Sequence, residues 1–304
     1  MANWYTRHRF LLMTLDPVHI GTGGYRLGRV DLSIVREPGT NLPKIPGTSL
    51  AGAARSYAAM RYGKIQCAGQ GGGAQPHCGQ PTCPICYTFG TARGTAGGNA
   101  GTVSLSDARL LLFPVHSMAG PVWVTTKSCL EEAGFEVTAP DLAREKCATT
   151  LPDWKKPLNL GWLLLECQDG EVKINLKNPP QHWKTVADRL VLVHESLLSH
   201  IVNSNLEVRT SVSIDPHTGA AAEGALFTYE ALPRATWLWM DVVEDDYRKQ
   251  FPVDDPKARE FNHQRPLDVV RAGLQLAEYL GIGGMGTRGF GRIKLMADWE
   301  VKHE

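Results

Sequence analysis

Hydrophobic and polar residues alternate in several short segments of the chain, and elsewhere apolar residues recur at helical spacing. Alternation is typical of strands, and a spacing of three or four residues is typical of amphipathic helices. The alternating segments that predict strands are 9–15, 30–35, 102–113 and 237–243. The helical spacing predicts one helix from about Gly47 to Gly63 and a second from Pro266 to Gly281. Both end at glycine, which is favoured just past a helix C-terminus.

The middle of the chain gives three further predictions. The turn signal Gln168-Asp169-Gly170 lies between two extended runs and predicts a hairpin over 160–176. Apolar residues at helical spacing predict a single helix over 186–201. The segments 208–214 and 226–230 flank a polar turn, which predicts a second hairpin with a long tip. The segments to which the sequence assigns no role are 127–185 and 244–263.

A glycine-rich segment follows the last predicted helix. Six of the eleven residues from Gly281 to Gly291 are glycine, and Arg288 and Arg292 lie in or directly after this stretch. Glycine lets the main chain turn N–H groups outward and approach a phosphate, and arginine adds charge-assisted hydrogen bonds. A tight helix-to-strand turn also uses glycine, so a plain turn is the alternative. The first turn of the helix near Gly47 is a second place where free N–H groups favour phosphate.

Composition is that of an ordinary globular protein, with 43% hydrophobic and 21% charged residues. The net charge of +1 excludes a uniformly polybasic protein. Charge is uneven, however, because residues 1–66 hold nine bases against three acids and residues 241–260 hold seven acids against four bases. One face is therefore expected to bind a polyanion while another stays acidic. With no membrane-spanning run and no signal-peptide core, we expect a cytoplasmic protein without a membrane partner.

Four of the seven cysteines fall within twenty residues. Cys67, Cys78, Cys83 and Cys86 end in a C-x2-C chelate, and four thiolates suit tetrahedral zinc. His77 is an alternative ligand to Cys67, although ligation by the adjacent His77 and Cys78 is geometrically awkward. With no open coordination position, the zinc site is predicted to be structural and to staple an insertion that lacks its own core. Ordinary reduced cysteines in a loop are the alternative, and a disulfide framework is not expected in a cytosolic chain.

Several motifs in a fixed order resemble one protein family. They are a strand followed by a glycine loop, Lys44-Ile-Pro-Gly-Thr-Ser-Leu50 opening a helix, Cys83-Pro-Ile-Cys86 before Phe89-Gly90, and the terminal glycine-rich loop. This set resembles the RAMP superfamily of CRISPR effector proteins. The motifs that resemble its large repeated backbone subunit in the type III-B complex are Gly28–Glu37, Leu112–Ser117, Glu223–Phe227 and Leu232-Pro233.

The resemblance implies an α+β fold with an RRM/ferredoxin-like palm, in a single RAMP domain over 1–304. A zinc-binding insertion would span 64–101, and a protruding thumb hairpin would span 205–232. The implied partners are guide CRISPR RNA, complementary target RNA, further copies stacked head to tail, and other CRISPR effector subunits. The implied activity is metal-dependent endoribonuclease cleavage of target RNA within this ribonucleoprotein complex.

The resemblance also assigns roles to individual residues. Asp31 falls at the position of the family's cleavage aspartate, where a carboxylate near arginines can bind Mg²⁺ or take the proton of a 2′-hydroxyl. From spacing alone, a solvated loop aspartate would be the simpler interpretation. Glu223 and Tyr229 are candidates for catalytic support, or equally for a structural role. The residues expected to bind RNA are His19, Arg26, Lys44, Ser49, Arg55, Gly283, Gly284, Gly286 and Arg288.

Three other functions stay open from the sequence. The chain would serve as a non-catalytic guide-RNA scaffold, although Asp31 favours the enzyme. It would alternatively process guide RNA as an endoribonuclease, with His19 as acid and base and no need for a metal. As a plain zinc-dependent structural protein, it would show no salt-sensitive RNA binding.

Overall fold

The computed structural model describes residues 4–23, 30–69, 77–91, 98–176, 179–180, 182–221 and 226–301. Helices and strands alternate irregularly along the chain, which confirms an α+β fold. The elements are β1 (Thr6–Thr14), α1 (Gly47–Arg61), η1 (Ile65–Cys67), α2 (Pro84–Phe89), β2 (Val103–Leu105), β3 (Arg109–Ser117), β4 (Gly120–Thr125), α3 (Lys127–Glu132), β5 (Glu136–Thr138), β6 (Lys146–Thr149), β7 (Leu158–Leu160), β8 (Leu163–Cys167), β9 (Lys173–Asn175), α4 (Trp183–Ala187), β10 (Leu190–Val193), α5 (Glu195–Ser204), β11 (Glu207–Ser211), β12 (Phe227–Ala231), β13 (Trp237–Glu244), α6 (Pro256–Glu260), α7 (Pro266–Leu280), η2 (Gly286–Arg288) and β14 (Ile293–Val301).

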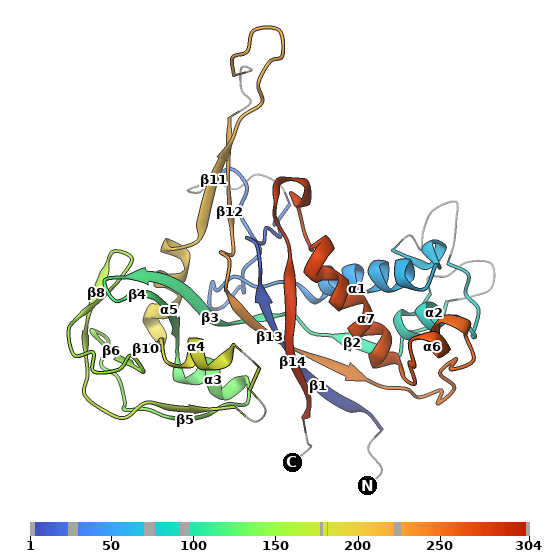
Figure 1. Ribbon diagram of the computed structural model, residues 1–304, viewed down its shortest axis with the longest axis horizontal. Helices are drawn as coiled ribbons and strands as arrows, with labels where there is room; N and C mark the ends of the chain where they lie inside the picture. Colours follow the sequence, from blue (N-terminus) through green and yellow to red (C-terminus); the bar gives the residue numbers. More distant parts are fainter. Residues whose placement is uncertain are drawn as a thin grey trace.

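A ten-stranded sheet forms the frame of the molecule (Figure 1). Its order is β14-β1-β13-β3-β4-β10-β6-β8-β7, and β2 pairs with β13 off this path. Neighbouring strands are antiparallel except for the pairs β4–β10 and β6–β8. β11 and β12 form a separate two-stranded ribbon that projects from the body, and the loop between α7 and β14 lies at the same end of the molecule (Figure 1).

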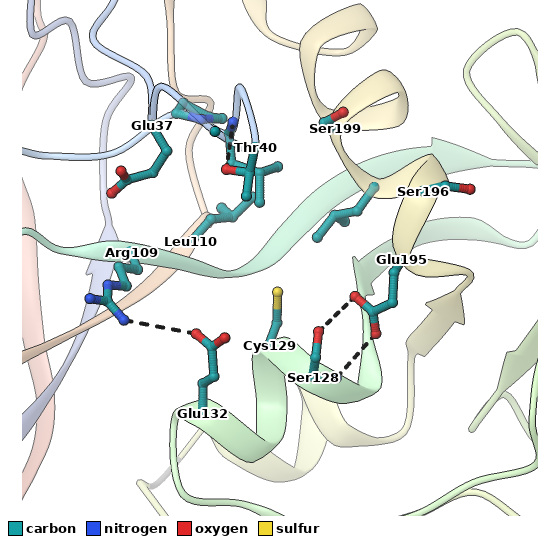
Figure 2. A pocket seen from close by; sticks show the side chains of 14 residues that line it. Glu37, Thr40, Arg109, Leu110, Ser128, Cys129, Glu132, Glu195, Ser196 and Ser199 are labelled. Atoms are coloured by element: carbon teal, nitrogen blue, oxygen red, sulfur yellow. Dashed lines mark hydrogen bonds and ion pairs between the residues drawn. The ribbon is translucent and has the colours of Figure 1, made fainter.

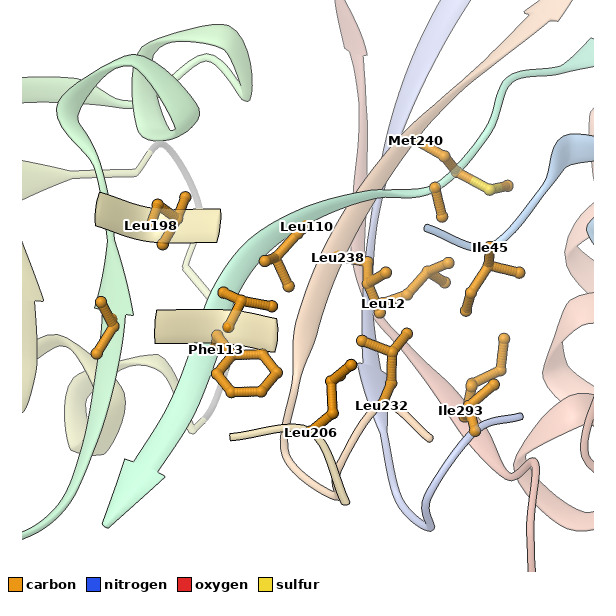
Figure 3. Packing of buried hydrophobic residues seen from close by; sticks show 14 of the residues in the cluster. Leu12, Ile45, Leu110, Phe113, Leu198, Leu206, Leu232, Leu238, Met240 and Ile293 are labelled. Atoms are coloured by element: carbon orange, nitrogen blue, oxygen red, sulfur yellow. The ribbon is translucent and has the colours of Figure 1, made fainter. Parts of the chain in front are cut away.

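Alternation along the central strands sends apolar side chains to both faces of the sheet. Leu238 and Met240 of β13 belong to a large core to which α1, α5 and α7 contribute (Figure 3). Trp237 and Trp239, one residue out of phase, belong to a second core together with Trp183 of α4. Both faces of β13 are therefore buried, and its tryptophans are core residues.

α1 and α7 cross at a glycine. A Cβ added to Gly273 of α7 would lie 2.1 Å from the carbonyl oxygen of Ala54 in α1. Real Cβ atoms do not approach that closely, so only glycine permits this crossing. The Tyr57 hydroxyl of α1 also donates a hydrogen bond to the carbonyl oxygen of Gly281, directly after α7. The crossing therefore fixes where the glycine-rich loop leaves α7.

The predicted single helix over 186–201 is wrong. α4 ends at Ala187, β10 occupies Leu190–Val193, and α5 begins at Glu195. All four residues of β10 are buried, and β10 pairs with β4 on one side and β6 on the other. Four consecutive apolar residues fit a strand buried on both faces, and their spacing alone does not exclude a helix. His194 then caps α5 by accepting a hydrogen bond from the backbone N–H of Ser196.

The predicted hairpin over 160–176 is also wrong. β8 turns back on β7 through Gly161, which has a φ of +70°, and β9 pairs with the distant β5. Gly170 instead packs against Pro140, where an added Cβ would lie 2.9 Å from the proline ring. The strand predicted over 30–35 is reduced to isolated bridges that join Ile34 to Gly21 and Leu32 to Tyr229.

The other predicted elements are confirmed. They are the first strand, both helices, the projecting ribbon, the strand at 237 and the extended segment 102–113, which the structure divides into β2 and β3. Within the described ranges, no helix is long and apolar enough to cross a membrane.

Gly273→Ala is expected to destabilise the chain by about 1–3 kcal/mol, because the new methyl group would overlap the main chain of α1. The matched control is Gly52→Ala in α1, where no atom lies within 4 Å of the added Cβ. The control should gain about 0.5–1 kcal/mol from helix propensity. Urea unfolding of both variants measures the difference, and an unchanged midpoint for Gly273→Ala would contradict the close crossing.

Candidate nucleic-acid interface and metal centre

A small aromatic cluster lies where the β11–β12 ribbon joins the body. Tyr229 of β12 packs edge-on against Phe290 of the α7–β14 loop, with 5.5 Å between ring centroids. Leu32, Phe227 and Met285 pack around this pair. The cluster therefore holds together three segments that are distant in sequence: the residues around 32, strand β12 and the glycine-rich loop.

Asp31 lies beside β12 at the base of the ribbon. Its Oδ2 accepts hydrogen bonds from the backbone N–H of Thr228 at 2.7 Å and from Thr228 Oγ1 at 2.8 Å. The backbone N–H of Asp31 donates in turn to Thr228 Oγ1 at 3.1 Å. The bonds from Thr228, the main-chain one first, lower the pKa of Asp31 below its ordinary value. A charged, exposed carboxylate is thus held in place by a strand.

A buried glutamate fastens the segment that carries Asp31 to β12. Glu230 accepts a hydrogen bond from the N–H of Ile34 at 2.9 Å and forms an ion pair with Arg36 at 2.6 Å. The N–H of Leu32 donates to the Thr228 carbonyl at 3.0 Å, and the N–H of Glu230 donates to the Leu32 carbonyl at 3.2 Å. The position of this segment therefore depends on β12.

His19 is buried, with 6% of its surface exposed. Its Nδ1 lies 2.7 Å from the carbonyl oxygen of Glu230, and its ring packs edge-on against Tyr229. Its own carbonyl oxygen accepts a hydrogen bond from the N–H of Gly284 at 2.9 Å. These contacts make His19 a link between β12 and the glycine-rich loop, and they give no support to a role as acid and base.

The glycine-rich loop uses glycine for two different reasons. Gly283 (φ +80°) and Gly291 (φ +99°) run so close to other main chain that a Cβ would lie 2.5 Å from the His19 carbonyl oxygen and 2.4 Å from that of Ile282. Gly286 has no atom within 4 Å of an added Cβ, and residues 286–289 are exposed. The loop is therefore pinned on one side and open on the other.

An open groove of about 390 Å³ separates this loop from the first half of α1. Ser49 and Ser56 line one wall, and Gly283 and Gly286 line the other. None of the described lining residues is acidic. The structure thus brings together three of the residues predicted to bind RNA. The exposed Arg288 lies at the ribbon side of the loop, with its guanidinium carbon 5.5 Å from the centroid of the Phe227 ring.

Lys44 lies outside this groove and is held by acidic side chains. Its ammonium group lies 2.5 Å from Asp107 and 3.3 Å from Glu37. Asp107 also accepts the N–H of Gly47 at the start of α1, at 2.7 Å. The structure therefore accounts for Lys44 as part of the α1 N-terminus. Two other predicted site residues, Arg26 and Glu223, lie outside the described residues.

Four cysteine side chains converge as the sequence predicted. The Sγ atoms of Cys67, Cys78, Cys83 and Cys86 all lie within 4.8 Å of one another, with 3.6 Å between Cys78 and Cys86 and 3.8 Å between Cys67 and Cys83. Zn–S bonds of about 2.3 Å in a tetrahedron put sulfurs about 3.8 Å apart. Hydrogen bonds from the neighbouring thiols, Cys86 first, lower the pKa of Cys83. The cluster can therefore hold a metal ion such as zinc.

Two residues beside the cluster are occupied by main-chain contacts. His77 Nε2 lies 2.9 Å from the Ala68 carbonyl oxygen, and its ring is not part of the convergent group. Arg55 of α1 donates to the carbonyl oxygens of Cys67 at 2.8 Å and Gly90 at 2.9 Å. Arg55 therefore braces the cysteine-rich segment against α1, and it does not line the groove.

Three residues at the ribbon base were not predicted from the sequence as site residues. They are Thr228 and Glu230, described above, and Arg209, whose guanidinium carbon lies 4.6 Å from the ring centroid of Phe290. Thr228 and Glu230 are two apart in a strand and hence share a face, which is a signal for a common polar partner. The partner segment around Asp31 leaves no such signal, because it is not a regular strand.

A larger cavity of about 590 Å³ lies between β3, α3, α5 and the loop before α1 (Figure 2). Glu132 lies 3.9 Å from Arg109 at its edge, and Glu195 accepts hydrogen bonds from Ser128. Its carboxylates would repel a polyanion, and none of the predicted site residues lines it. The candidate nucleic-acid interface is therefore the groove and the ribbon base.

Three features characterise this fold: a sheet covered by helices, a projecting ribbon, and a glycine-rich loop before the last strand. The model of the RAMP superfamily matches residues 11–294, a range that runs from β1 into β14. The chain belongs to the RAMP superfamily.

Its particular relatives are CRISPR proteins. The chain is 27% identical over 303 residues to the CRISPR system Cmr endoribonuclease Cmr4 of Pyrococcus furiosus, covering 93% of each protein. It matches the cryo-EM structure of type III-B Cmr-beta bound to cognate target RNA with a TM-score of 0.65 and 16% identity, over 96% of this chain and 98% of the other. It matches the crystal structure of oligomeric Cmr4 from Pyrococcus furiosus with a TM-score of 0.60 and 19% identity, over 97% and 100%. The family resemblance of the motifs is confirmed.

The purified chain is expected to contain about one zinc ion, and Cys83→Ser should release it. Metal-binding free energy contributes to folding, so the variant should also melt at a temperature lower by roughly 5 °C or more. Cys129→Ser is the control, because Cys129 lies outside the cluster. Metal analysis and thermal unfolding measure both effects. Purified parent protein that lacks metal but melts at the same temperature as metal-loaded protein would contradict the structural role.

Proposed function

We propose that this chain is a backbone subunit of a type III-B CRISPR effector complex, which holds guide RNA and cleaves complementary target RNA with Asp31. One observation carries the proposal: an exposed carboxylate is fastened at the base of a projecting ribbon, on the aromatic cluster that also seats the glycine-rich loop. The similarity to Cmr4, an endoribonuclease by name, over 93% of both proteins supports the activity.

In this proposal the parts of the fold have separate tasks. The strands around β1 and β13 with α1 and α7 act as the RRM/ferredoxin-like palm. The segment 205–232 acts as the thumb that separates nucleotides of the bound strands. The segment 64–101 is an insertion stapled by zinc. All three belong to one RAMP domain.

Guide RNA would run past the groove between α1 and the glycine-rich loop. The walls of this groove present the hydroxyls of Ser49 and Ser56 and the main chain of glycines. None of the described lining residues is acidic. Arg288 adds a cation beside the ribbon. Such groups contact phosphate and sugar and do not read base edges, so guides of different sequence would bind alike.

Cleavage of the target needs its 2′-hydroxyl to lose a proton while the oxygen attacks the adjacent phosphate. The product ends would be a 2′,3′-cyclic phosphate and a 5′-hydroxyl. A lowered pKa makes Asp31 a weak base near neutral pH, so its contribution is mainly charge. One carboxylate with substrate phosphate oxygens is a ligand set that fits Mg²⁺. When bound, this ion would supply positive charge to the phosphate under attack.

The proposed partners follow from the same assembly. Relatives of this fold include an oligomeric Cmr4 crystal and a Cmr-beta complex with target RNA. Val208 of β11 is exposed, and so are Val212 and Ile214 just after that strand, with 42%, 42% and 57% of their surfaces accessible. Apolar side chains on a projecting ribbon fit contact with a neighbouring copy and with displaced bases.

Asp31→Asn is expected to reduce target cleavage by about 100-fold or more, because the amide keeps the shape but loses the charge. Guide and target binding should stay unchanged. The measurement is cleavage of labelled target by the reconstituted complex, with filter binding in parallel. Asp254→Asn is the control, since that side chain is 83% exposed and pairs with Arg259. Full cleavage by Asp31→Asn would leave the chain as a scaffold or assign the chemistry to another residue.

Gly286→Glu is expected to weaken guide-RNA binding about fivefold, and more strongly at low salt. A carboxylate about 4 Å from a phosphate costs about 1 kcal/mol in water. The added side chain meets no atom within 4 Å of its Cβ, so folding should be preserved. Gly39→Glu has equally open space and lies beside the acidic cavity. Equal affinities of the two variants, at 50 and 300 mM salt, would argue against RNA in the groove.

A further inference from the structure

Three hydrogen bonds join Thr228 of β12 to Asp31. The Thr228 hydroxyl donates to Asp31 Oδ2 at 2.8 Å and accepts from the Asp31 N–H at 3.1 Å. The Thr228 N–H donates to the same Oδ2 at 2.7 Å. Both donors engage one carboxylate oxygen, and Oδ1 forms no hydrogen bond within the described part of the chain. One oxygen is anchored while the other faces solvent.

The anchor belongs to the ribbon. Thr228 lies in β12, opposite Thr210 of β11, one residue before the aromatic cluster at Tyr229. Asp31 is followed by the segment that Glu230 fastens along the same strand. The carboxylate therefore takes its position from β12, and any shift of the ribbon base carries it along.

Building on the proposed function, we propose that Thr228 is a positioning residue for target cleavage. It ties the Asp31 carboxylate to the ribbon, so the position of the ribbon base determines where the target is cut. Thr228 does not contact the reacting atoms in this role. It fixes the rotamer of Asp31, keeps Oδ1 free for the metal ion or substrate, and couples the cut to the nucleotide that the ribbon displaces.

The side-chain chemistry makes this role separable from strand stability. Valine matches threonine in shape and is equally suited to a strand, but it has no hydroxyl. Serine keeps the hydroxyl and loses only a methyl group. A purely structural role for Thr228 would therefore rank valine above serine, whereas the positioning role ranks serine above valine.

Thr228→Val is expected to lower the cleavage rate at saturating target by about tenfold, because a hydrogen bond to a charged group is lost. Target affinity should be unchanged. Thr228→Ser should restore most of the rate. Thr210→Val is the matched control on the facing strand, where the side chain is exposed, and it should cleave like the parent. Each variant is assayed in the reconstituted complex with labelled target, and its melting temperature is measured.

Parent-like cleavage by Thr228→Val overturns the inference, and so does an equal loss in the valine and serine variants. Loss in Thr210→Val to the same degree would also overturn it, since the effect would then belong to the ribbon as a whole. Should Thr228→Val fail to fold, Thr228→Ala against Thr228→Ser decides by the same ranking. The proposed function is tested separately, because normal cleavage by Asp31→Asn would contradict it. If Asp31→Asn is inactive and Thr228→Val cleaves normally, only the positioning role of Thr228 is contradicted.

Discussion

A two-stranded ribbon has almost no core of its own, so its direction depends on what packs against its base. Here that base is the contact of Tyr229 with Phe290 and the ion pair of the buried Glu230 with Arg36. The first contact joins the ribbon to the loop after α7, and the second joins it to the segment of Asp31. This small cluster therefore fixes the relative positions of the ribbon, the glycine-rich loop and the Asp31 carboxylate.

The cysteine cluster acts on the same interface from the other end of α1. Arg55 holds the carbonyl oxygens of Cys67 and Gly90, while Ser49, less than two turns earlier on α1, lines the groove. Burial lowers the pKa of Arg55, so its main-chain contacts matter for keeping a cation there. A metal ion in the cluster would therefore stabilise α1 as well as the insertion, and so the wall of the groove.

The sequence predicted well those features that depend on local chemistry. Glycines at helix ends, the C-x2-C spacing and the ribbon's turn residues act within a few positions, and α1, α7, the cysteine cluster and the ribbon follow from them. Features decided by tertiary contact were missed. Leu190–Val193 is a strand because β4 and β6 flank it, and β8 pairs with β7 because Gly161 allows the tighter turn. The role of Thr228 could not be predicted, because it depends on the contact with Asp31 that the fold creates.

Exposure and a fixed position usually conflict for a carboxylate, because a side chain free to meet a ligand is also free to rotate. Asp31 combines both, since its donors belong to a strand that is itself anchored in a buried cluster. The groove follows the same rule: Gly283 and Gly291 are pinned by main chain, and Gly286 remains open. With a net charge of only +1, the RNA binding proposed for this chain cannot rest on bulk electrostatics. In that proposal, many such pre-placed contacts supply the affinity and would also fix the register of the RNA strand relative to the carboxylate.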